Sequence, residues 1–82
     1  MQFLLMCRSL TYAQRSARIL ERAGITAAVQ RAPREITTRG CGYCVVVSAR
    51  NGADSMERLT EAGLRPERVF RRSGGKLEEA SL

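Results

Sequence analysis

The stretch SARILERAGI (residues 16–25) returns later in the chain as SMERLTEAGL (residues 55–64), and the two align without a gap. The alignment pairs Leu20 with Leu59, and both copies end in Ala-Gly followed by an apolar residue. Apolar residues at helical spacing followed by a glycine are typical of a helix that ends in a left-handed residue. The repeat therefore predicts two similar halves, each built around one helix.

Strand-like segments flank both predicted helices. They are QFLLMC (2–7), ITAAVQ (25–30), YCVVVSA (43–49) and RPERVFR (65–71). The first and third of these segments are apolar at nearly every position, which indicates strands that are buried on both faces. We expect Thr11, with Gln14 as its capping-box partner, to open the first helix, and Asn51 or Asp54 to cap the second.

The element order β-α-β-β-α-β predicts an α+β fold of the ferredoxin-like class. Right-handed crossovers would give an antiparallel four-stranded sheet of order 4-1-3-2, with two helices on one face. We expect residues 1–72 to form this single domain. Residues 73–82, SGGKLEEASL, have little apolar surface to bury and are expected to form a flexible tail.

Composition limits the functions that this chain of 82 residues can have. Histidine is absent, so the usual general base and the commonest zinc ligand are missing, and conventional hydrolase chemistry or a structural zinc site is not expected. No apolar run reaches the roughly 18 residues of a membrane span, and no signal peptide is evident, so we expect a cytoplasmic protein. Three cysteines, an odd number, then indicate reduced thiols with a chemical role.

The chain is basic, with 14 lysines and arginines against 8 acidic residues. Such a balance is compatible with an anionic partner, nucleic acid included. The arginines are spread along the sequence, however, and only Arg71 and Arg72 are adjacent. Aromatic residues that could stack on bases are few. Nucleic-acid binding is therefore not the favoured function.

Two cysteines form the motif Cys41-Gly42-Tyr43-Cys44. The motif could be a redox pair, part of a metal site, a carrier thiol, or two structural cysteines. It leads into a strand and lacks the helix N-terminus that lowers a thiol pKa in thioredoxin-type motifs. In extended chain the two Cα atoms would lie about 10 Å apart, too far for a disulfide. The predicted topology also brings Cys7 to this edge, so three thiolates binding a soft metal remain an alternative.

Cys41 differs from the other cysteines because Gly40 and Gly42 flank it. Glycines let the backbone bend and let a ligand approach closely. Arg34 and Arg39 are near in sequence and could stabilise a thiolate. This pattern predicts an accessible, reactive sulfur at Cys41.

Three short motifs then resemble a known family. Ala23-Gly24-Ile25, Pro33-Arg34-Glu35-Ile36 and Cys41-Gly42, in this order and spacing, are similar to small bacterial domains described as selenium/sulfur carrier-like. The resemblance covers about residues 2–71. The sequence departs from the pattern at Arg39 and Cys44, where small polar and plain apolar residues are more usual.

The resemblance implies a non-enzymatic carrier that holds sulfur or selenium on Cys41 as a persulfide or selenosulfide. Pro33, Arg34, Glu35 and Ile36 would shape the loop before it. Cys44 and Cys7 are candidates for auxiliary thiols, but their apolar neighbours in sequence favour small buried cysteines. The resemblance also implies a donor such as a cysteine desulfurase, an acceptor protein, and no resident cofactor or metal. An alternative is a dimerising interaction module with structural cysteines, because an open sheet normally shows water one polar face.

Overall fold

The computed structural model describes residues 1–37 and 42–81. Its helices and strands follow the predicted order, with one further strand at the C-terminal end. They are β1 (Gln2–Cys7), α1 (Leu10–Arg22), β2 (Ala28–Arg31), the 3-10 helix η1 (Arg34–Ile36), β3 (Tyr43–Ser48), the 3-10 helix η2 (Ala49–Asn51), α2 (Gly52–Glu61), β4 (Arg68–Ser73) and β5 (Lys76–Glu79). No helix within the described ranges is long and apolar enough to cross a membrane.

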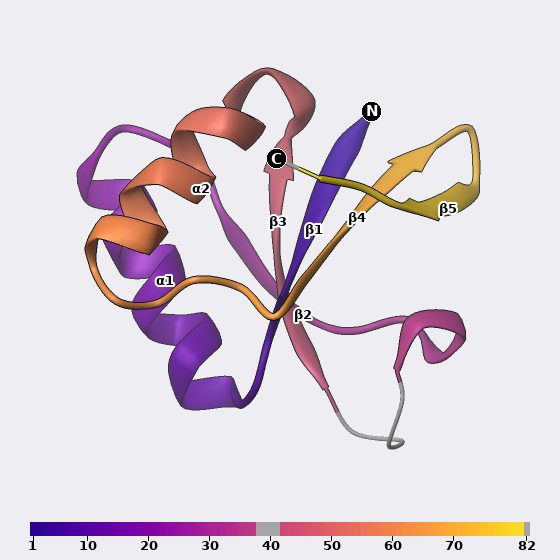
Figure 1. Cartoon of the computed structure of the whole chain (residues 1–82), viewed down its shortest axis with the longest axis horizontal. Coiled ribbons are helices and arrows are strands. Elements are labelled where there is room, and N and C mark those ends of the chain that lie inside the picture. Colours follow the sequence, from indigo (N-terminus) through magenta and orange to yellow (C-terminus); the bar gives the residue numbers. More distant parts are fainter. Residues whose placement is uncertain (38–41, 82) are drawn as a thin grey trace.

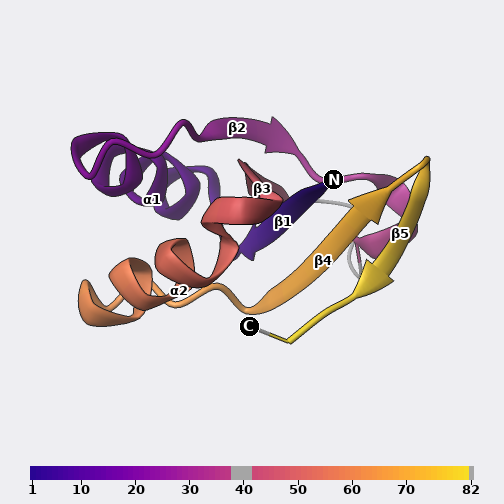
Figure 2. The same cartoon turned by 90° about the horizontal axis from the view of Figure 1, so that it is seen from above.

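The strands form one antiparallel sheet in the order β2-β3-β1-β4-β5 (Figure 1). Strands β1 and β3 are central, and both helices pack on one face of the sheet (Figure 2). The α+β class with two helices is confirmed. The predicted order 4-1-3-2 is confirmed for β4, β1, β3 and β2, but the prediction of four strands is wrong, because β5 extends the sheet beyond β4.

The internal repeat corresponds to two helices that end in the same way. Gly24 and Gly63 have φ angles of 83° and 75°, in the left-handed region predicted for them. Beyond each glycine a backbone amide donates to a carbonyl five residues back, Ile25 to Leu20 at 2.9 Å and Leu64 to Leu59 at 2.8 Å. This is the Schellman arrangement, and it explains why the repeat includes both the glycine and the apolar residue after it.

Helix α1 starts earlier than the sequence predicted. Ser9 is the N-cap residue, and its hydroxyl accepts a hydrogen bond from the Tyr12 amide at 3.2 Å. The helix begins at Leu10, so Thr11 lies inside its first turn and the predicted capping box with Gln14 is wrong. Both Ser9 and Thr11 can cap a helix, and the end of β1 at Cys7 favours the earlier one.

The helical face of the sheet carries the larger of two cores. Leu5 and Val45 are opposite each other on β1 and β3 and are fully buried. Helix α1 covers them with Leu20, and α2 with Leu59, both also fully buried. The two halves of the repeat thus supply equivalent leucines to one apolar cluster.

A second core lies on the opposite face of the sheet. Leu4 and Cys44 from the central strands are fully buried there, and Phe70 of β4 is 5% exposed. Ile36 of η1 belongs to the same cluster, and Leu77 of β5 packs against it. The apolar residues on both faces of β1 and β3 are therefore covered within one chain, which removes the observation that had suggested dimerisation.

Strand β5 falls within the segment assigned to a flexible tail. Gly74 and Gly75 both have positive φ, 56° and 81°, and form a two-residue turn between β4 and β5. Such a turn matches the twist of a hairpin. Two cross-strand ion pairs hold the hairpin, Arg68 with Glu79 at 2.9 Å and Arg71 with Glu78 at 3.2 Å. The turn and the ion pairs therefore act together with Leu77 to place β5 on the sheet.

Candidate functional site

The predicted acceptor Cys41 lies outside the described residues, together with Arg39 and Gly40. The chain on both sides of residues 38–41 is described. It leaves η1 at Thr37 and resumes at Gly42, immediately before β3. The site can therefore be built from these two flanks and from the elements that pack beside them.

The segment before the gap is a tight turn formed by the PREI motif. Pro33 precedes η1, and its carbonyl accepts from the Ile36 amide at 3.2 Å and from the Thr37 hydroxyl at 2.6 Å. Ile36 is buried in the second core, whereas Arg34 and Glu35 are exposed. The motif thus anchors the loop through its apolar residue and presents its charged residues to solvent.

The segment after the gap begins at Gly42, whose carbonyl accepts from the Ala32 amide at 2.9 Å. A Cβ atom built on Gly42 would lie 3.5 Å from the Thr37 methyl carbon and 3.7 Å from the Ala32 Cβ, which is ordinary contact. The contacts around Gly42 therefore leave room for a Cβ atom.

A cleft of about 380 Å³ lies where the two flanks meet. Arg31, Ala32, Arg34, Thr37 and Gly42 line it. Because Cys41 is joined directly to Gly42, this cleft borders the peptide segment of the predicted acceptor. The structure brings Arg34 and Gly42 together in the lining of this cleft.

Cys44 is fully buried in the second core, opposite Met6 of β1 and Gln30 of β2. Burial raises the pKa of its thiol from 9.0 to about 11. A thiol with this pKa stays protonated at neutral pH, and the thiolate is the nucleophile. Cys44 has the surroundings of a structural cysteine.

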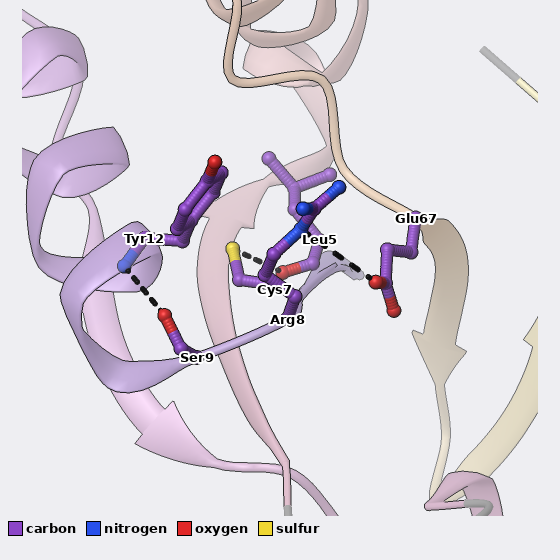
Figure 3. A network of polar contacts seen from close by, with 6 residues as sticks. All are labelled: Leu5, Cys7, Arg8, Ser9, Tyr12 and Glu67. Carbon is purple, nitrogen blue, oxygen red and sulfur yellow. Dashed lines mark hydrogen bonds and ion pairs between the residues drawn. The ribbon is translucent and has the colours of Figure 1, made fainter.

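Cys7 is also buried, with 7% of its surface exposed. Burial raises the pKa of its thiol, and contact with the Ser16 hydroxyl partly opposes that increase. The thiol donates a weak hydrogen bond to the Leu5 carbonyl at 3.6 Å (Figure 3). Cys7 is therefore held as a neutral thiol at the end of β1.

Cys7 and Cys44 lie on opposite faces of the sheet. Cys7 pairs with Tyr43 and Cys44 with Met6, so the two cysteines are diagonal neighbours across adjacent strands. Successive side chains of a strand point to opposite faces, and the two thiols accordingly belong to different cores. The described residues contain no group of three potential metal ligands. The end of β1 lies beside the start of β3, as predicted, but the thiols of Cys7 and Cys44 do not face a common space.

Two arginine-tyrosine stacks at the same end of the sheet were not anticipated. The Arg8 guanidinium lies 4.9 Å from the centre of the Tyr12 ring, and that of Arg31 lies 5.9 Å from the centre of the Tyr43 ring. Figure 3 shows Arg8 beside Tyr12, close to Cys7. Arg31 and Tyr43 meet through the register of β2 and β3, whereas Arg8 and Tyr12 are four residues apart, across the start of α1.

Comparison with known proteins assigns the chain to a family. The family described as "Putative Se/S carrier protein-like" matches residues 2–71. The chain belongs to this family. No curated protein and no solved structure matches it. The match spans both halves of the repeat and the whole candidate site, from β1 into β4.

Proposed function

We propose that this member of the selenium/sulfur carrier-like family transports sulfur or selenium bound to Cys41 as a persulfide or selenosulfide. The supporting observation is the state of the other two cysteines. Cys7 and Cys44 are buried with raised pKa values, so neither supplies a thiolate at neutral pH. Cys41 is the remaining cysteine of the chain. Its attachment to Gly42, beside a cleft that Arg34 also lines, suits a thiolate carrier.

The chemistry needs neither a general base nor a resident cofactor. The Cys41 thiolate attacks the outer sulfur of a donor persulfide, forming a new S–S bond as the donor S–S bond breaks. The electron pair leaves with the donor cysteine as its thiolate, so nothing is oxidised or reduced overall. Attack by an acceptor thiolate reverses this sequence. A chain without histidine can carry out both steps.

Incubation with a cysteine desulfurase and L-cysteine, followed by intact mass measurement, tests the proposal. We expect the wild-type protein to gain one sulfur atom that dithiothreitol removes, and Cys41→Ser to gain none. Cys7→Ala and Cys44→Ala are matched controls, because each removes one buried thiol and should leave loading unchanged. Loading that persists in Cys41→Ser, or that requires Cys44, would contradict the assignment of the carrier thiol.

A further inference from the structure

The end of the sheet at which β1 finishes and β3 begins carries an ordered row of side chains. Arg31, Tyr43 and Cys7 are direct partners on three adjacent strands and therefore share one face. Arg8 follows Cys7 and stacks on Tyr12 of α1. We name Arg8, Tyr12, Arg31 and Tyr43 the stacked rim. Its two arginines are exposed, and its two tyrosines are half-buried against the core that contains Cys7.

A third stack in the same chain shows what such an arginine binds. The Arg68 guanidinium lies 4.8 Å from the Phe70 ring centre. It also donates two hydrogen bonds to the carboxylate of Glu79, at 3.0 and 2.9 Å. The aromatic ring holds the planar guanidinium in place, and the two parallel donors fit the two carboxylate oxygens. A stacked arginine is thus already a carboxylate-binding group in this protein.

The arginines of the stacked rim also lie over aromatic rings, Arg8 about as closely as Arg68 and Arg31 at 5.9 Å, but neither has an equivalent bidentate partner among the described residues. Among residues 1–37 and 42–81, no carboxylate lies within 4.0 Å of Arg31. Within the same ranges the one carboxylate near Arg8 is that of Glu67. Its oxygen is 4.0 Å from the Arg8 Nε atom, beyond hydrogen-bond distance, and both side chains are more than half exposed (Figure 3). Their donors are therefore available to a partner.

From these contacts we infer that the stacked rim is a docking surface for an acidic segment of a partner protein, recognised by carboxylates that pair with Arg8 and Arg31. The inference deepens the proposed function and rests on it, because the rim borders the strand that continues from Cys41 and Gly42. Tyrosine and arginine are also the residue types that contribute most at protein interfaces.

The stacks favour a protein partner over single-stranded nucleic acid. Proteins bind unpaired bases mainly by stacking them on exposed aromatic rings. Here one face of each tyrosine is covered by its own arginine, and both tyrosines pack against the core. The surface therefore offers planar cationic donors rather than free aromatic faces.

The test measures binding of a fluorescein-labelled peptide of alternating glutamate and alanine, by fluorescence anisotropy at low, constant salt. Arg8→Gln/Arg31→Gln removes two charges from the rim. Arg18→Gln/Arg50→Gln is the matched control, since it removes two exposed charges from α1 and η2. We expect a loss of about fivefold or more for the rim variant and less than about twofold for the control.

A charge-conserving variant tests whether peptide binding depends on the guanidinium groups or on positive charge alone. Arg8→Lys/Arg31→Lys keeps both charges but loses the planar, bidentate guanidinium, and should bind the peptide about two- to fivefold more weakly. Equal losses in the rim and control variants, or wild-type affinity in the lysine variant, would overturn the inference. Tighter binding of an RNA oligonucleotide of equal charge, lost in the same rim variants, would overturn it in favour of nucleic acid.

Peptide binding is also measured in Cys41→Ser, where docking should be unchanged because the rim does not include the thiol. Failure of sulfur loading with intact, rim-dependent docking would reject the carrier proposal alone. Loading of the wild-type protein without rim-dependent docking would reject the docking surface alone.

Discussion

Replacing Cys44 by alanine should remove part of the pH dependence of stability at alkaline pH. Burial raises the pKa of the Cys44 thiol from 9.0 to about 11, so between these values the unfolded chain releases a proton that the folded chain keeps. The corresponding stability is fully present below pH 9 and is lost as the pH rises through the folded pKa. The rise in the pKa of Cys44 from 9.0 to about 11 corresponds to about 2.7 kcal/mol in the free energy of unfolding. This free energy falls most steeply near pH 10, by about 1 kcal/mol per pH unit.

Urea unfolding followed by circular dichroism, under reducing conditions between about pH 8 and 11, measures this contribution. The free energy of unfolding of the wild-type protein should fall by about 2 kcal/mol more over this range than that of Cys44→Ala. Cys7→Ala, which retains Cys44, serves as the control and should keep that extra loss. The same pH dependence in wild type and Cys44→Ala would refute the reasoning and show that this thiol ionises in the folded protein.

Three other predictions test the fold. Gly24→Ala should destabilise the protein by about 1 kcal/mol in thermal unfolding, because the φ of Gly24 is positive. Gly42→Ala should change stability by less than about 0.5 kcal/mol, because a Cβ atom fits there. Equal effects of the two substitutions would contradict the left-handed conformation of Gly24. Ser9→Ala should cost about 1 kcal/mol through loss of the α1 cap, and Thr11→Ala much less, with the reverse order reinstating the predicted capping box. Leu77→Ala should cost about 1 to 2 kcal/mol in urea unfolding, because it uncovers part of the second core; a neutral effect would show that β5 does not stabilise the sheet.

Much of the fold could be predicted because local and global signals agree. The repeat encodes two helices with Schellman ends, and the apolar runs at 2–7 and 43–49 encode central strands. Strand β5 was missed because its four residues include one apolar side chain, Leu77. The sequence Ser73-Gly74-Gly75-Lys76 could have indicated this hairpin, because two adjacent glycines between short extended segments predict a two-residue turn.

The candidate site was less accessible to prediction. The PREI turn and Gly42 could be named in advance, because they are contiguous with Cys41 in sequence. The separation of Cys7 and Cys44 onto opposite faces depends on register, since a shift of one residue would exchange the faces. The stacked rim depends on the same register and on the actual start of α1, so sequence spacing alone could not place Arg8 beside Tyr12.

The β4–β5 hairpin affects where this domain can be cut. The family match ends at residue 71, inside β4, whereas ladder pairing continues to Glu79. An expression clone that stops at the family boundary would leave Arg68 and Arg71 without their carboxylate partners and expose the edge of β4. An unpaired edge strand is a template for aggregation. Truncated versions, fusion junctions and affinity tags are therefore best placed beyond residue 81.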